Sequence, residues 1–164
     1  MHSTTAKWTV CFWADMTGNG SGTIMGDAAT NNTNNGFQII CTSTNGTFRA
    51  RVTDSGGVVT QLITSSGFVP QDNAMHFYKI TYDQSLSSDN MKMSVDNGTN
   101  VTQTKTGNAP TNGNSQTELY IGSSDATNFF LAGEVAEMSI WSRVLTDAEV
   151  TAIYNSGSGV FPLF

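Results

Sequence analysis

Two carboxylates near the C-terminus come nearest, in type and spacing, to a catalytic pair. A glycoside hydrolase needs one carboxyl group as acid and a second as base or nucleophile, flanking one glycosidic bond. Residues two apart on a strand share a face, so such groups are expected at even spacing. Glu134 and Glu137 are three apart, which on a regular strand places them on opposite faces, and Ala136 is apolar. The sequence therefore predicts no catalytic residue, and glycan cleavage ranks behind two other interpretations.

The histidines and cysteines do not form a pattern typical of a catalytic site or a metal site. The chain has two histidines, and His76 falls in a predicted strand, where we expect a half-exposed residue and not a base or a ligand. No zinc-ligand spacing occurs. Cys11 and Cys41 lie in separate predicted strands. A disulfide would require those strands to be adjacent, with facing side chains, which the sequence cannot show, so buried free thiols are the preferred interpretation.

A sugar-binding site needs aromatic rings at a rim or on a concave face, with polar groups nearby for the hydroxyls. The candidates for ligand contact are Arg49, Arg51, Tyr82, Phe129 and Phe130. Packing of the two phenylalanines beneath their own loop is the alternative. The three tryptophans, Trp8, Trp13 and Trp141, fall in strands and are predicted to belong to the core.

Composition limits the classes of partner. The 164 residues suffice for one domain with a sizeable core, and only 12% are charged. A net charge of −6 with 7 Lys and Arg argues against nucleic acid and against anionic membranes. No apolar run reaches membrane-spanning length, and the N-terminus has no signal-peptide core. The polar, weakly charged composition is typical of extracellular and virion surfaces, so we expect one of these locations, reached after removal of a leader or by lysis of a phage-infected cell.

The elements that must position these residues are short strands separated by turn signals. Asn45-Gly46 is a strong hairpin signal, and Ser55-Gly56-Gly57 marks a second hairpin. This pattern predicts an all-β sandwich. The expected strands are Lys7–Asp15, Thr23–Met25, Gly36–Thr44, Thr47–Thr53, Val58–Ile63, Met75–Asp83, Met91–Asp96, Val101–Thr106 and Glu118–Gly122.

The stretch Leu131–Gly157 encodes a closing strand followed by a helix over 146–156. Alternation gives way to a capping box, in which Thr146 is followed three residues later by Glu149. Leu145 and Val150 are spaced for a hydrophobic staple, and Gly157 is expected to end the helix in a left-handed cap. The apolar tail GVFPLF is expected to pack against the domain.

The same stretch, GEVAEMSIWSRVLTDAEVTAIYNSG, resembles the closing segment of laminin-G-like and pentraxin-like domains of the concanavalin A-like lectin/glucanase superfamily. Those domains commonly end with a Gly-Glu-aliphatic strand, a Trp, an Arg-x-Leu corner and a short Asp-Ala-Glu helix. The resemblance continues upstream in the expected order. Its segments are WTVCFWAD, GFQIICTSTNGTFRARVTDSGG, FYKITYD, MKMSVDNGT and ELYIGSSD. It implies one jelly-roll domain over residues 1–164, an antiparallel sandwich of two sheets with one short helix.

The resemblance also implies a calcium site. Laminin-G and pentraxin domains often bind Ca²⁺ at one rim, through the loop before the strand equivalent to Gly36–Thr42 and the loop after the strand equivalent to Glu118–Gly122. Mapped onto this chain, the metal-ligand candidates are Asp27, Asn34, Asn35, Asp125 and Asn128. Ca²⁺ takes six to eight oxygen ligands, and this set has only two carboxylates. Capping of their own turns by these side chains is the alternative.

Two functions of different classes follow. The first, favoured by the resemblance, is a non-catalytic recognition module that binds a glycan or a cell-surface ligand through rim loops, with Ca²⁺ as the one expected cofactor. The second is a structural module, such as a phage capsid decoration or tail-fibre domain, acting as a homo-oligomer or as part of a larger virion or multidomain assembly. No nucleic acid partner and no membrane insertion are expected.

Overall fold

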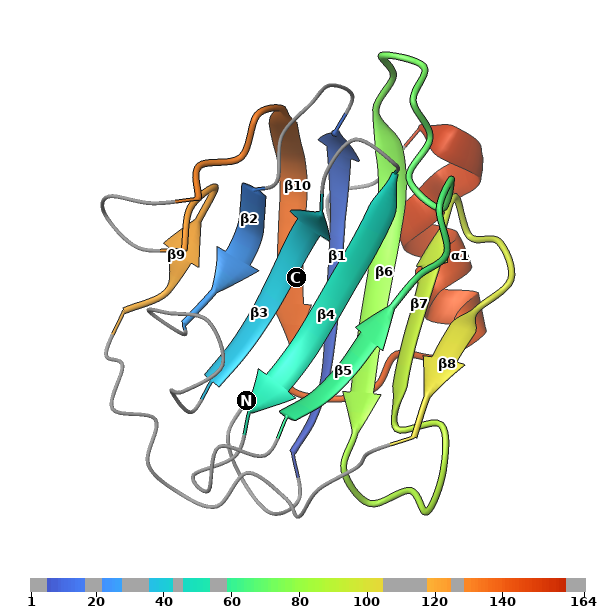
Figure 1. Ribbon diagram of the computed structural model, residues 1–164. Coiled ribbons are helices and arrows are strands. Elements are labelled where there is room, and N and C mark those ends of the chain that lie inside the picture. The colour runs from blue at the N-terminus through green and yellow to red at the C-terminus, as the bar shows by residue number, and fades with distance from the viewer. Residues whose placement is uncertain are drawn as a thin grey trace.

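The computed structural model describes residues 6–16, 22–27, 36–42, 46–53, 59–104, 118–124 and 129–158; the side chain of Thr42 is left out. These residues form two antiparallel sheets of five strands each, packed face to face, with one short helix (Figure 1). The arrangement confirms the predicted antiparallel jelly-roll sandwich. The apolar tail predicted to pack, 159–164, lies outside the described residues.

The first sheet has the strand order β10-β1-β6-β7-β8. Its strands are β1 (Lys7–Asp15), β6 (His76–Asp83), β7 (Met91–Val95), β8 (Val101–Gln103) and β10 (Glu134–Trp141). Strand β7 ends at Val95, one residue before the predicted end at Asp96, because both Asp96 and Asn97 adopt left-handed backbone, with φ of 48° and 55°.

The second sheet has the order β5-β4-β3-β2-β9. Its strands are β2 (Gly22–Gly26), β3 (Gly36–Thr42), β4 (Thr47–Thr53), β5 (Val59–Ile63) and β9 (Tyr120–Ile121). Pairing of β3 with β4, and of β4 with β5, confirms both predicted hairpins. The strand expected over Glu118–Gly122 is reduced to two residues, so β9 is a short edge.

The main core lies between the sheets and is built on aromatic rings. Phe12 and Tyr78 from the first sheet stack at 5.4 Å between ring centroids, and Phe48 from the second sheet stacks on Tyr78 at the same distance. Trp8 is 1% exposed and packs against Phe37 and Tyr82. The alternation of β1 therefore places Trp8, Val10 and Phe12 in the core between the sheets.

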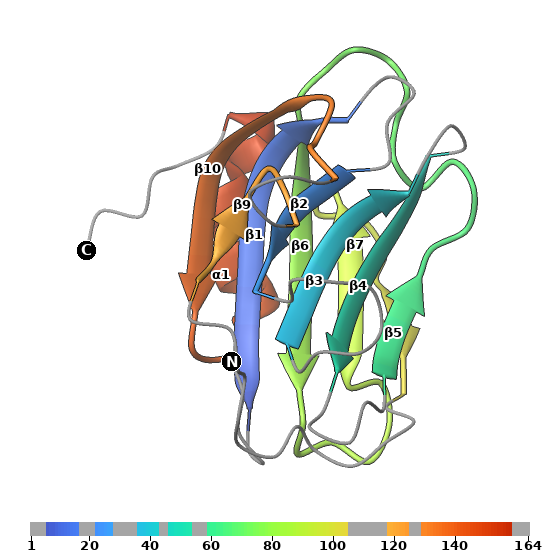
Figure 2. The same ribbon diagram turned by 60° about the vertical axis from the view of Figure 1, so that its left-hand side comes forward.

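A second cluster covers the outer face of the first sheet. Helix α1 (Asp147–Tyr154) lies on this face, away from β3 and β4 (Figures 1 and 2). Its Val150 packs with Leu145, Cys11 and Trp13, and Tyr154 stacks on Trp13 at 5.9 Å. This cover explains why β1 is apolar on both faces. Trp141, expected in the core, is only partly buried at the margin of this cluster.

The helix begins as predicted and ends earlier. Thr146 and Glu149 form the capping box, and both staple residues, Leu145 and Val150, are buried. The left-handed cap is Asn155, with φ of 45°, and not Gly157, which ends a following 3-10 turn. The chain leaves the helix early because asparagine tolerates the left-handed conformation almost as glycine does.

A β-bulge changes the expected geometry of the two carboxylates. Cys11 pairs with Ser139 but Trp13 pairs with Ala136, so β10 contains one extra residue, and Glu137 has a φ of 50°. The bulge breaks the alternation on which the opposite-face prediction rested. Glu137 borders a shallow outer-face pocket beside Trp13, and the register of Glu134 with Asp15 places it on the same side. That prediction is therefore wrong, although Glu134 does not line the pocket of Glu137.

The two cysteines are free and buried, as preferred from the sequence. Cys41 belongs to the core between the sheets, whereas Cys11 faces the helix-covered cluster on the outside of the first sheet. One sheet thus separates the two thiols. Burial raises the pKa of Cys11 to about 12, so it is a neutral packing group at physiological pH.

His76 lies at the start of β6 between two carboxylates. Its Nδ1 is 2.6 Å from Asp96 Oδ2, its Nε2 is 3.0 Å from Asp72 Oδ1, and its side chain is 16% exposed. Burial acts to lower the pKa of His76, but the hydrogen bonds and charges of Asp96 and Asp72 outweigh it and raise the pKa overall. The residue is a structural ion-pair group at the strand end, close to the half-exposed strand residue predicted.

Because the pKa of His76 is higher in the folded than in the unfolded state, its ion pairs stabilise the domain fully below about pH 6.5. This stabilisation is lost as pH rises through the folded-state pKa of His76. We therefore expect urea unfolding to show a larger stability advantage of the native chain over His76→Gln at about pH 5.5 than at about pH 8.5. An equal difference at both pH values would show that His76 does not gain charge stabilisation on folding.

Candidate ligand-binding site

Two exposed phenyl rings stand at the rim beside β2 and β9. Phe129 is 52% exposed and Phe130 is 61% exposed. The backbone that presents them is fixed, because Thr23 N–H donates to Phe129 O at 3.0 Å and Leu131 N–H donates to Gly122 O at 2.8 Å. The alternative, packing beneath the loop, does not hold for either ring.

Phe129 also has an uncommon backbone conformation. Its φ of 54° lies in the left-handed region, which is costly for a bulky residue and is associated with functional positions. Leu131, two residues after Phe129, is partly buried against the main core, and Gly22 lets Leu131 approach, since a Cβ on Gly22 would lie 2.5 Å from Leu131 Cα. This packing anchors the segment, while both phenyl rings remain in solvent. Ile121 of β9, 58% exposed, extends the apolar surface.

The two arginine candidates project from β4 on the outer face of the second sheet. Their neighbours Phe48, Ala50 and Val52 face the core, so Arg49 and Arg51 must point outward. Arg49 is half-buried, and Arg51 is only 2% exposed. Burial lowers the pKa of both groups, for Arg51 to about 10 with a further contribution from the charge of Arg49. This face therefore holds concentrated positive charge with little water around it.

Tyr82 is not a surface residue. It is 1% exposed, stacks on Trp8 at 5.7 Å and bonds through its hydroxyl to Gln84. The prediction that it contacts a ligand is corrected, because strand alternation turns Tyr82 into the main core between the sheets. Of the five ligand-contact candidates, the phenylalanines lie together at the rim, and the arginines lie together on β4, three strands from β9 in the sheet order.

Only one candidate calcium ligand lies among the described residues. Asp27 follows β2, and its Oδ1 accepts a hydrogen bond from Phe37 N–H at 2.8 Å. Asn34, Asn35, Asp125 and Asn128 lie outside the described residues. In the part of the chain that the structure describes, no three His, Cys, Asp or Glu side chains gather as a metal site would require. Asp27 serves here as a cap for the start of β3.

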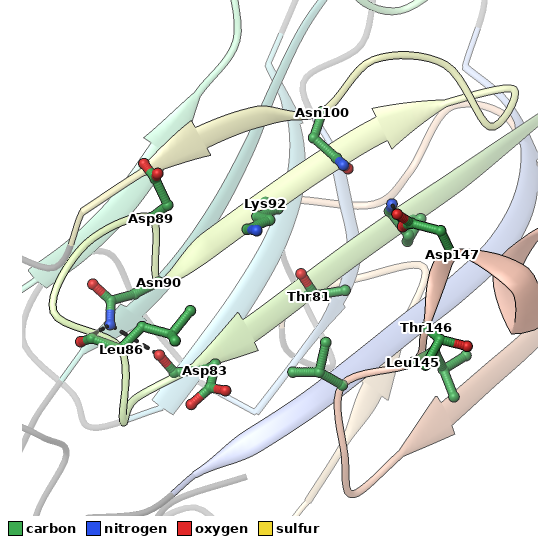
Figure 3. A pocket seen from close by; sticks show the side chains of 12 residues that line it. Thr81, Asp83, Leu86, Asp89, Asn90, Lys92, Asn100, Leu145, Thr146 and Asp147 are labelled. Atoms are coloured by element: carbon green, nitrogen blue, oxygen red, sulfur yellow. Dashed lines mark hydrogen bonds and ion pairs between the residues drawn. The ribbon is translucent and has the colours of Figure 1, made fainter.

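The outer face of the first sheet carries a pocket that the sequence did not indicate. It encloses about 220 Å³ beside the N-terminus of α1 (Figure 3). Strands β6 and β7 provide Lys79, Thr81 and Lys92, and Asn100 and Asp147 reach in from the β7–β8 turn and the helix. The only sequence feature that pointed to this pocket was the alternation of polar residues in β6. That alternation does not indicate that the helix lies beside the strand.

The amino-acid sequence matches the family Laminin_G_3, described as the Concanavalin A-like lectin/glucanases superfamily, over residues 2–151. No curated protein matches. In the described residues, no helix is both long and apolar enough to cross a membrane.

Solved structures share the fold at low identity. A Ruminococcus gnavus IT-sialidase CBM40 has a TM-score of 0.70 and 14% identity, with 92% of this chain and 83% of that chain covered. The binding domain of botulinum neurotoxin serotype D has a TM-score of 0.66 and 14% identity, covering 94% and 38%. A structure titled NanB plus Optactamide has a TM-score of 0.73 and 16% identity, covering 90% and 24%. This chain thus spans well under half of the last two proteins.

The family match extends over most of the sequence and agrees with the observed sandwich. The chain belongs to the Laminin_G_3 family of the Concanavalin A-like lectin/glucanases superfamily.

Proposed function

We propose that this domain is a non-catalytic glycan-recognition module that works outside a cell or on a virion. The superfamily description names lectins and glucanases, and structural neighbours include a sialidase CBM40 and a toxin receptor-binding domain. Of the two carboxylates considered as a catalytic pair, Glu137 lines the shallow pocket beside Trp13 and Glu134 does not. Recognition therefore fits the chain better than cleavage.

The observation that carries the proposal is the pair of solvent-exposed rings at Phe129 and Phe130. Sugars present C–H groups that pack on aromatic faces, and water-exposed rings held by a rigid backbone lose little entropy on binding. The left-handed φ of Phe129 indicates a conformation maintained despite its cost. The half-buried Arg49, on the face of the same sheet, supplies charged hydrogen-bond donors for a longer or acidic glycan.

The test is a glycan-array screen of the domain, followed by calorimetry on the best ligand. We expect the double variant Phe129→Ala/Phe130→Ala to bind roughly tenfold to hundredfold more weakly, since two stacked rings contribute about 1–3 kcal/mol. Ile63→Ala is the matched control, because Ile63 is 52% exposed on the opposite edge strand. Undiminished binding by the double variant would refute the rim site. Repeating the titration with CaCl₂ and with EDTA tests calcium assistance at Asp27 and the two neighbouring loops.

A structural module is the second candidate, favoured by the continuity of the same apolar surface. Leu119, directly before the two-residue edge strand β9, is 48% exposed, and Ile121 within that strand is 58% exposed. Exposed apolar side chains beside a sheet edge are suited to pairing with another copy. Sedimentation of the domain and of the double variant separates the two functions. A concentration-dependent oligomer that the double variant abolishes, with no glycan bound, would favour assembly.

A further inference from the structure

The pocket on the outer face of the first sheet is lined by a largely buried lysine, Lys79, whose ammonium group has no protein hydrogen-bond acceptor among the described residues. The Lys79 side chain is 5% exposed, and its nearest carboxylate oxygen, Asp147 Oδ1, is 3.9 Å away, beyond hydrogen-bond distance. In the described part of the chain no other acceptor reaches its ammonium group. Asp147 itself is 92% exposed, so water screens its charge. An ammonium group on a largely buried stem, with donors that protein acceptors in the described residues leave unused, is suited to an anionic acceptor that enters the pocket.

The second strand of the pocket floor adds another positive charge. Lys79 pairs with Ser94 and Thr81 pairs with Lys92, so the two lysines are diagonal neighbours on β6 and β7. Such positions lie about 7–8 Å apart at Cα, close enough for one small ligand to touch both side chains. No carboxylate within ion-pair distance of Lys92 is found in the described ranges. Burial lowers the pKa of Lys79, and the like charge of Lys92 adds to this lowering, against the opposing charge of Asp147.

The walls of the pocket provide groups for hydroxyls. Asn100 points over the strands between Lys92 and Asp147 (Figure 3), and its Oδ1 is buried without a donor among the described residues. Thr81 has its side chain in the floor, and Asp89 stands at the opposite end from Asp147. A volume of about 220 Å³ is below the roughly 300–1,000 Å³ of sites for drug-sized ligands, and it matches a single sugar ring.

We propose that this pocket is a second binding site, which takes one carboxylate-bearing monosaccharide unit with its carboxylate on Lys79 and Lys92. The ring hydroxyls would bond to Asn100, Thr81 and the rim carboxylates. The site shares no residue with the rim beside β9 and lies on the opposite sheet. Its existence therefore does not depend on glycan binding at Phe129 and Phe130.

The experiment is an amide-resonance NMR titration of the full chain with glucuronate, with glucose and with inorganic phosphate. Glucuronate is expected to shift the amides of Lys79, Thr81, Lys92 and Asn100, glucose much less, and phosphate more weakly than glucuronate. Lys79→Met should weaken glucuronate binding tenfold or more, as expected for loss of a charged hydrogen bond. The variant should fold at least as well as the native chain, because it removes a buried charge and retains the stem volume.

Ile63→Ala, on the edge strand β5 of the other sheet, is the control and should leave the glucuronate titration unchanged, while Phe129→Ala/Phe130→Ala separates this site from the rim. Absence of shifts at tens of millimolar glucuronate would overturn the proposal. So would equal affinity for glucose, tighter binding of phosphate, or undiminished binding by Lys79→Met. Lys92→Met should also weaken glucuronate binding, and it tests the site independently if Lys79→Met does not fold.

Discussion

Phe48→Ala should destabilise the domain by about 3–5 kcal/mol, the largest effect of any single truncation considered. Phe48 is fully buried and connects the two sheets, since it stacks on Tyr78 at 5.4 Å and packs on Phe12 and Phe68 at 6.3 Å. Its removal costs the transfer of the ring, three aromatic contacts and a cavity that neighbouring rings cannot fill without breaking their own stacks. Guanidinium unfolding and a melting temperature lower by roughly 10 °C would report the loss.

Phe130→Ala is the matched control for that substitution. The chemical change is the same, but Phe130 is 61% exposed, so its truncation should alter stability by no more than about 0.5 kcal/mol. If both variants lost similar stability, the phenyl ring of Phe48 would not be the link between the sheets that its contacts indicate.

Gly22→Ala should destabilise the domain by about 2–3 kcal/mol and disturb the aromatic rim at the same time. A Cβ at this position would lie 2.5 Å from Leu131 Cα and 2.8 Å from Phe130 O, both backbone atoms that cannot rotate away. The segment must then move off β2, which breaks the hydrogen bond from Thr23 N–H to Phe129 O. We expect faster amide hydrogen exchange at Thr23 and Leu131, together with weaker glycan binding.

Gly67→Ala separates crowding from backbone strain. Gly67 has a φ of 80° and nothing within 4 Å of an added Cβ, so its substitution should cost only about 1–2 kcal/mol of left-handed strain. Exchange at Thr23 and Leu131 should be unaffected in that variant. Native-like exchange in Gly22→Ala would mean that β2 does not hold the rim segment in place.

Local chemistry was sufficient to place most elements along the chain. Alternation identified β1 and β6, turn residues identified the β3–β4 and β4–β5 hairpins, and Thr146 with Glu149 identified the helix start. Each signal depends on residues a few positions apart, so it can be recognised in the sequence without knowledge of the fold. The bulge at Glu137 could not be seen, because an extra residue in β10 is defined only against its partner β1.

The candidate site was predictable only where exposure follows from local structure. Phe129 and Phe130 were identified as ring candidates in a polar loop, and the structure leaves both in solvent. Tyr82 is also aromatic, but its side chain points into the core between the two sheets, so its ring is removed from the surface. Exposure of a strand residue depends on what packs over it, which is a long-range property.

The sequence by itself determined an all-β sandwich with a capped C-terminal helix and a weakly charged surface, because propensity, turn chemistry and capping act between near neighbours. Only the tertiary structure decided which faces were covered. It placed Cys11 and Cys41 on opposite sides of one sheet, and it brought Lys79, Lys92 and Asp147 to one pocket from two strands and a helix. Strand register and the docking of α1 set those distances, and both follow from contacts between residues far apart in the chain.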